Sequence, residues 1–82
     1  MKLSRDLSSA ELEKALHNAF GDQFVRQLGS QRRLTTQTGG EHHLTIPNHD
    51  PLRLGTLRAV LAEVMAHHRL TLEQVLHRLD LG

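Results

Sequence analysis

Two glycine-containing pairs, Gly29-Ser30 and Gly39-Gly40, constrain the fold of this 82-residue chain more than any other feature. Glycine readily adopts the positive φ angles of tight turns, so both pairs suit the turns of β-hairpins. They separate three short segments of strand-forming residues, 24–28, 33–37 and 42–46. The middle of the chain is therefore predicted to form a three-stranded antiparallel sheet in which consecutive strands are neighbours.

Alternation in the third of these segments predicts which side of the sheet is covered. His42, Leu44 and Ile46 share one face, whereas His43 and Thr45 share the other. Leu and Ile favour burial, so the first face is expected to pack against helices and the second to stay open. The two histidines then point to opposite faces, and together they cannot chelate one metal ion.

A helical pattern precedes the three segments. Apolar residues recur at helical intervals from Leu12 to Phe20. Ser8 and Glu11 have the spacing of a capping box, in which each side chain accepts a hydrogen bond from the backbone of the other. Gly21 is suited to the left-handed position that ends a helix. An amphipathic helix is therefore predicted between Ser8 and Gly21.

Two further helices are predicted after the sheet. Thr56 is expected to be the N-cap of the first and Thr71 that of the second, where Gln74 completes another capping box. Each helix has one apolar stripe, formed by Leu57, Val60, Leu61, Val64 and Met65 in the first and by Leu72, Val75, Leu76 and Leu79 in the second. The predicted class is α+β, with the order α-β-β-β-α-α, a three-stranded antiparallel sheet and helices on one of its faces.

The composition limits the kinds of protein that the chain can be. Its length allows one small domain, residues 1–82, without a large enclosed cavity. It has no cysteine, which excludes disulfides and cysteine-based metal sites. It contains no apolar run of the roughly 18 residues that span a membrane, and its first residues lack the apolar stretch of a secretory signal. We therefore expect a soluble protein of the reducing cytoplasm.

Basic residues are concentrated in the middle of the chain. The net charge is +1, but residues 26–58, with five basic and two acidic residues, carry +3 and the remainder −2. The five basic residues are all arginines: Arg26, Arg32, Arg33, Arg53 and Arg58. Arginine suits two-point contacts with phosphate, so this stretch is the candidate anion-binding surface, although a solvated basic face is the commoner use of such a cluster. The only aromatic residues are two phenylalanines, which argues against a base-stacking platform.

Three stretches of the chain resemble the HicA family of toxins. In order, they are Gly29-Ser30-Gln31-Arg32-Arg33-Leu34, His43-Leu44-Thr45-Ile46-Pro47-Asn48-His49 and Leu52-Arg53-Leu54-Gly55-Thr56-Leu57. The likeness spans nearly the whole chain, and the order and spacing of the stretches make it specific. It implies a fold similar to double-stranded-RNA-binding domains, a metal-independent endonuclease acting on mRNA, and a hetero-oligomer with a HicB antitoxin that covers the active site.

The resemblance also implies a catalytic position, and this sequence departs from the family there. In the family, a His that acts in acid/base chemistry follows the Gly-Ser pair, and here Gln31 occupies that position. Glutamine has no group that titrates near neutral pH, so a contribution of roughly 10²–10⁴-fold to the rate is missing. Gln31 is either a substitution that deliberately inactivates a toxin, which the intact remainder of the motif favours, or a natural variant that binds RNA without cutting it efficiently.

Five more residues are expected to bind RNA: Ser30, Arg32, Arg33, His49 and Arg53. The arginines would steer and neutralise phosphate. His49 lies between Pro47 and Pro51, where a rigid loop either presents its side chain to a substrate or simply exposes it to water. No cofactor and no metal site is expected, because the histidines lack a convincing ligand spacing with a carboxylate.

Two other functions fit the same residues. If Gln31 is native, the fold and the arginines support a non-catalytic module that binds double-stranded RNA. Alternatively, the open face or edge of the sheet binds a protein, and the chain is an interaction domain. Salt-sensitive binding of duplex RNA without cleavage after Gln31→His would favour the first, and a stable heteromer without RNA binding would favour the second.

Overall fold

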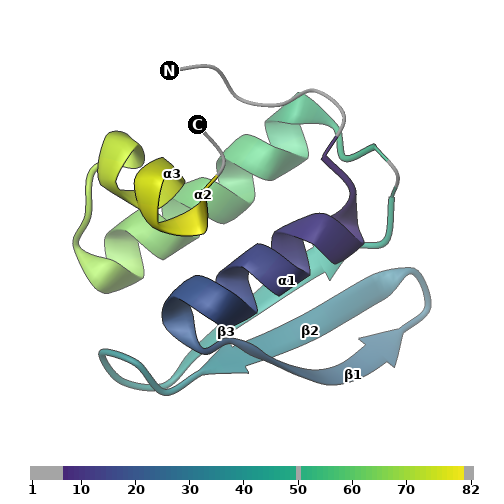
Figure 1. Ribbon diagram of the computed structural model, residues 1–82. Helices are drawn as coiled ribbons and strands as arrows, with labels where there is room; N and C mark the ends of the chain where they lie inside the picture. Colours follow the sequence, from purple (N-terminus) through teal and green to yellow (C-terminus); the bar gives the residue numbers. More distant parts are fainter. Residues whose placement is uncertain (1–6, 50, 81–82) are drawn as a thin grey trace.

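The computed structural model describes residues 7–49 and 51–80. Along the chain, its elements are α1 (Ser9–Phe20), β1 (Gln23–Leu28), β2 (Gln31–Thr36), β3 (His42–Pro47), α2 (Leu54–His68) and α3 (Leu72–Leu79). The three strands form one antiparallel sheet in the order β1-β2-β3, and the helices lie together on one side of it (Figure 1). The predicted α+β class and the predicted α-β-β-β-α-α order are confirmed.

Both glycine pairs lie in connections between strands, as predicted. Gly29 has a φ of 60°, and with Ser30 it joins β1 to β2. Gly39 and Gly40, with φ angles of 71° and 104°, belong to the connection between β2 and β3. Side chains are strained at these angles, so glycine allows the chain to reverse at both places. β2 begins at Gln31, earlier than the predicted segment, and this brings the candidate catalytic position into the sheet.

The covered face of the sheet supplies part of the hydrophobic core. Leu34 of β2 and Leu44 and Ile46 of β3 are buried beneath the helices. His43 and Thr45 are exposed on the opposite face, as the alternation predicts. From the helices, the core receives Leu12, Leu16, Phe20, Leu57, Val60, Leu61, Val64, Val75, Leu76 and Leu79. Packing therefore supports the sheet from one side only and leaves its other face open.

Capping boxes start α1 and α3, as predicted. Ser8 and Glu11 exchange both hydrogen bonds of such a box at the start of α1, and Thr71 and Gln74 do the same for α3. Gly21 ends α1 in the left-handed conformation, with a φ of 74°. These boundaries follow from local side-chain chemistry, which is why the sequence predicts them correctly.

Two predicted features of the later helices are wrong. α2 begins at Leu54 with Arg53 as its N-cap and no side-chain cap, so Thr56 lies within the first turn. The N–H of Leu57 donates to the carbonyl oxygen of Arg53 at 2.9 Å, which closes the first helical turn ahead of the predicted cap. Leu72, expected in the buried stripe of α3, is 41% exposed because it stands at the first position of the helix, at the edge of the packed face.

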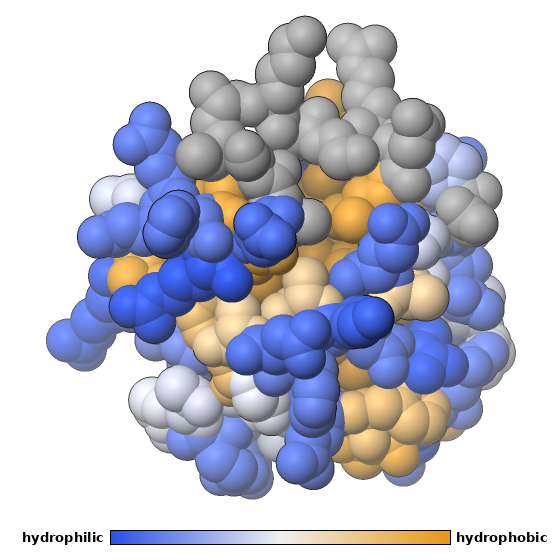
Figure 2. All heavy atoms as spheres, viewed as in Figure 1, coloured by the Kyte–Doolittle hydropathy of each residue, from blue (hydrophilic) through white to orange (hydrophobic). Residues whose placement is uncertain are grey.

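Exposed apolar side chains gather on the edge strand β1. Figure 2, in the view of Figure 1, shows hydrophilic residues over most of this side and apolar atoms between them. Three large apolar side chains of the edge strand β1 are exposed, namely Phe24, Val25 and Leu28. Within the described residues, no helix combines the length and the apolar character needed to cross a membrane.

Candidate nucleic-acid interface

The β1–β2 turn and the loop after β3 meet at one end of the sheet. The backbone N–H of Asn48 donates to the carbonyl oxygen of Ser30 at 2.6 Å. Gln31, which follows the turn, pairs with Pro47 across β2 and β3. His49 comes directly after Asn48 in the same loop. Three of the predicted site residues, Ser30, Gln31 and His49, are therefore brought to the same end of the molecule.

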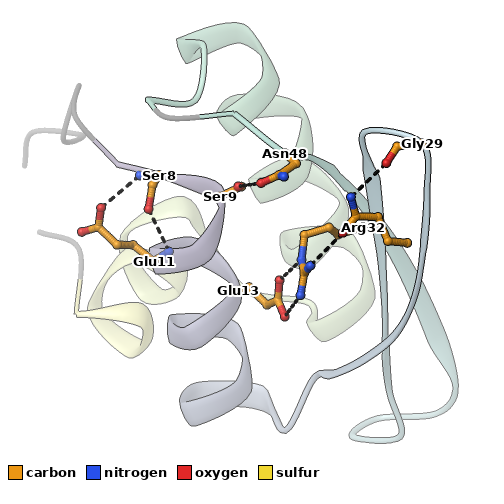
Figure 3. A network of polar contacts seen from close by, with 8 residues as sticks. Ser8, Ser9, Glu11, Glu13, Gly29, Arg32 and Asn48 are labelled. Carbon is orange, nitrogen blue, oxygen red and sulfur yellow. Dashed lines mark hydrogen bonds and ion pairs between the residues drawn. The ribbon is translucent and has the colours of Figure 1, made fainter.

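The loop is also attached to the start of α1. Ser9, buried in the first turn of the helix, donates from its N–H to the carbonyl oxygen of His49 at 3.0 Å. Its hydroxyl group donates to Oδ1 of Asn48, also at 3.0 Å (Figure 3). The loop is thus held between α1 on one side and the β1–β2 turn on the other, which fixes the backbone that carries His49.

Gln31 and Arg33 lie on the open face of the sheet. Leu34 and Thr36 of the same strand are buried, so the alternation of a strand directs Gln31 and Arg33 to the opposite face. Gln31 is exposed and Arg33 is half-buried. The position that the family resemblance assigns to catalysis therefore has an arginine beside it on the same surface.

Arg32 points to the other side of β2. Its Nε and Nη2 donate to the two carboxylate oxygens of Glu13 at 2.7 and 3.0 Å, and its Nη1 donates to Oε1 of Gln27 at 3.1 Å (Figure 3). The guanidinium carbon lies 4.1 Å from the centroid of the Phe24 ring. The hydrogen bond to Glu13 raises the pKa of Arg32. Arg32 therefore joins β2 to α1 and does not lie on the face that carries Gln31.

Arg53 lies in a different element from the arginines of β2. It is the exposed N-cap of α2, and Leu52 before it is buried. The N–H of Leu52 donates to the carbonyl oxygen of Leu7 at 2.7 Å, which directs the chain into α2. Within the described residues, no hydrogen bond joins Arg53 to the β1–β2 turn. Arg53 therefore lies at the start of α2, whereas Gln31 and Arg33 lie on β2.

The structure adds one arginine that our prediction of site residues left out. Arg26 of β1 is the direct pairing partner of Arg33, so both side chains lie on the open face. The signal was present in the sequence. In a hairpin with a two-residue turn at 29–30, residues equally distant from the turn are partners, and Arg26 and Arg33 are equally distant from it. The predicted second strand began at Arg33, and this obscured the relationship.

A group of aromatic and imidazole rings packs the end of α2 against β3 and α1. His67 stacks on His42 with ring centroids 4.3 Å apart, and His68 stacks on Phe20 at 4.2 Å. Nε2 of His67 donates to two carbonyl oxygens of the β2–β3 connection, at 3.0 and 3.2 Å. Burial lowers the pKa of His42 and of His68, and the nearby His67 adds to both shifts. Among the residues described, no group of three or more His, Asp or Glu side chains is arranged to hold a metal ion.

A buried carboxyl group, that of Asp22, lines a groove between α1 and β1. The groove has a volume of about 530 Å³, and its lining includes His17, Asp22 and Phe24. Burial raises the pKa of Asp22 to about 6, although His67 and His17 oppose the shift. Nδ1 of His17 donates to the carbonyl oxygen of Asp22 at 2.8 Å. Oδ2 of Asp22 has no hydrogen-bond partner among the described residues, so the ionised form is poorly stabilised.

The fold and the arginines together define the general class of the protein. It is a small α+β domain with helices on one side of a three-stranded sheet and a basic surface on the other. Residues 9–64 match the family described as "HicA toxin of bacterial toxin-antitoxin", and because this is more than half of the chain, the protein belongs to that family. A search of curated proteins and a search of solved structures each returned no match. The resemblance predicted from the sequence is confirmed.

Family membership establishes the general kind of activity. HicA toxins are ribonucleases of bacterial toxin–antitoxin systems, so the chain is a toxin component and has an antitoxin as its partner. The matched region ends within α2, and α3 lies beyond it. α3 packs against α1 and α2 and contributes Val75, Leu76 and Leu79 to the core. The last helix thus completes the hydrophobic core outside the matched region.

Proposed function

We propose that the protein is a metal-independent mRNA endoribonuclease of the HicA type that acts in the cytoplasm and is inactivated by Gln31. The place of Gln31 is the observation that supports this proposal most strongly. It is exposed at the start of β2, beside the turn that contains Ser30 and the loop that carries His49. A histidine at this position would stand on an open surface next to Arg33, where an RNA strand has access.

RNA cleavage at such a site uses the 2′-hydroxyl group of the substrate as the nucleophile. The site must supply a base for the hydroxyl proton, an acid for the leaving oxygen and positive charge for the phosphorane. A histidine at position 31 would act as the base or the acid, and Arg33 would neutralise the phosphate. Gln31 can form hydrogen bonds but cannot take up or return a proton. The chain as it stands is therefore expected to bind RNA and to cleave it very slowly.

The remaining site residues have different roles in this proposal. Ser30 and His49 contact the RNA next to position 31, because the bond between Asn48 and Ser30 holds their two loops together. Arg53 contacts the backbone of the RNA farther along, at the start of α2. Arg32 is held by Glu13 in this proposal, so it would contact RNA only when that ion pair opens.

The antitoxin partner is proposed to be a HicB-like protein that forms a hetero-oligomer with the toxin. It would cover the surface that carries Gln31 and Arg33 and place acidic groups where RNA phosphates would otherwise lie. A structure of the complex in which this face stays open to solvent would contradict this arrangement.

Purified Gln31→His protein, incubated with labelled mRNA, tests the proposed activity. Gln37→His is the matched control, because Gln37 is an exposed glutamine just beyond the end of β2. We expect cleavage by Gln31→His and none above background by Gln37→His. A Gln31→His protein that neither cleaves RNA nor slows bacterial growth overturns the proposal. Salt-sensitive RNA binding by that same protein would then favour the non-catalytic binding module.

A further inference from the structure

Two arginines face each other directly on the open side of the sheet. Arg26 of β1 pairs with Arg33 of β2, and the next pair toward the turn is Leu28 with Gln31. Side chains of directly paired residues lie on the same face, so Arg26, Arg33 and Gln31 share one surface. The two pairs are separated by two residues of each strand, or about 7 Å.

This arrangement is unfavourable for the isolated protein. Like charges directly opposite each other destabilise an antiparallel pair of strands. Arg32, by contrast, is neutralised by Glu13. Within residues 7–49 and 51–80, neither Arg26 nor Arg33 lies within ion-pair distance of a carboxylate. An anion bound between the two guanidinium groups would remove the repulsion, so the pair has the character of an anion site.

The neighbouring pairs define where such an anion would lie. Thr45 of β3 pairs with Arg33, so a hydroxyl group extends the row formed by the two arginines. On the side of Arg33 away from Gln31, the next row is formed by Thr35 and His43. Nδ1 of His43 lies 2.7 Å from Oγ1 of Thr35, and its Nε2 lies 3.5 Å from Oε2 of Glu41. The acidic side chain of Glu41 disfavours an anion there. A bound anion is therefore favoured between the two arginines and Gln31, on the side away from Glu41.

We propose that Arg26 and Arg33 form a clamp for one phosphate group of the RNA strand and place the adjacent nucleotide at position 31. Guanidinium groups bind phosphate oxygens in a two-point geometry, which suits a tetrahedral anion held from both sides. The clamp contacts only the backbone, so it does not depend on the base sequence. Arg26 is a positioning residue in this scheme. The clamp rests on the proposed function, because that function makes RNA the anion and position 31 the reacting centre.

Binding of a fluorescein-labelled single-stranded RNA by the Gln31 protein tests the clamp without interference from cleavage. We expect Arg26→Gln to weaken binding about tenfold and to reduce the slope of log affinity against log salt by about 0.7. Arg26→Lys should keep the slope but recover only part of the affinity, since lysine lacks the fork of donors. Arg78→Gln on α3, an exposed arginine on the helical side, is the control and should leave both quantities unchanged.

Stability measurements separate the clamp from a structural role. Removal of one of two facing positive charges should leave the melting temperature of Arg26→Gln unchanged or raise it. Loss of RNA affinity together with a large fall in melting temperature overturns the proposal. RNA affinity and salt slope equal to those of Arg78→Gln also overturn it. Loss of antitoxin binding with RNA binding intact overturns it too, because the pair would then be a protein-binding surface.

The test distinguishes failure of the clamp from failure of the proposed function. In a Gln31→His background, Arg26→Gln should raise KM for RNA and also lower kcat, because the bound nucleotide is then held less well at position 31. Cleavage with an unchanged KM overturns the clamp and leaves the proposed function standing. Absence of cleavage, with RNA binding that still depends on Arg26, overturns the proposed function and supports phosphate binding by the two arginines without a reacting centre at position 31.

Discussion

The guanidinium group of Arg32 binds the carboxylate of Glu13 at two points, with Nε–Oε2 and Nη2–Oε1 distances of 2.7 and 3.0 Å. The pair connects β2 to α1, and about a quarter or less of each side chain is exposed. Arg33, the next residue, points to the open face instead. Two adjacent arginines therefore perform different tasks, one joining the layers and the other available to a ligand.

Exchange of each arginine for glutamine should separate these tasks. We expect Arg32→Gln to lower the melting temperature by a few degrees, since it leaves Glu13 without its partner. Arg33→Gln should leave the melting temperature nearly unchanged and weaken RNA binding more than Arg32→Gln does. Thermal unfolding and RNA titration of both variants check this. The reverse order in RNA binding would show that Arg32 leaves Glu13 and contacts the ligand.

Loss of the hydrogen bond between Ser9 and Asn48 should lower the stability by different amounts, depending on which of the two residues is replaced. Asn48→Ala leaves the buried Ser9 hydroxyl without an acceptor and should cost about 1–2 kcal/mol. Ser9→Ala leaves Asn48 exposed to water and should cost less than about 1 kcal/mol. Urea unfolding of both variants measures the difference. Equal losses would indicate that the hydroxyl group finds another partner.

Asp22 should make the protein less stable as the pH rises through the acidic range. Its pKa is about 6 in the folded protein against an ordinary value of 3.8, so the folded state binds more protons between these values. The neutral carboxyl group therefore contributes its full stabilisation of the folded state below about pH 4, and this contribution is lost as the pH rises through 6. His42 and His68 act in the opposite sense. Their pKa values are lowered in the folded protein, so they contribute stability above their ordinary pKa of 6.5. This contribution is lost as the pH falls below that value.

Asp22→Asn isolates the contribution of this carboxyl group. The free energy of unfolding of the variant, relative to the unchanged protein, should increase between pH 4 and pH 7 by on the order of 1–3 kcal/mol. The histidine contribution is common to both proteins and largely cancels in the comparison. Urea unfolding at the two pH values provides the measurement. A difference that does not change with pH would mean that Asp22 is not buried in its charged form.

The hairpins, the faces of the sheet and two helix starts could be predicted because each depends on local chemistry. Gly29 marks a turn, Leu44 and Ile46 mark a buried face, and the Ser8–Glu11 box marks a helix start. The start of α2 could not be predicted in this way. Arg53 caps it without a side-chain bond, so the sequence carries no capping signal there.

The candidate site depended on contacts between distant segments, and the sequence predicted it only in part. The resemblance indicated Ser30, Gln31 and His49, which the structure places at one end of the sheet. It also grouped Arg32 with Arg33. Only the position of α1 over the sheet shows that Glu13 engages the first of them.

The rate of RNA cleavage under single-turnover conditions shows whether residue 31 is the catalytic position. Gln31→His and the unchanged protein are compared at saturating protein concentration, so that differences in RNA affinity do not contribute. We expect a rate roughly 10²–10⁴ times higher for Gln31→His, with a dependence on pH that reflects titration of the new imidazole. Equal rates for the two proteins, across the pH range in which histidine titrates, would contradict it.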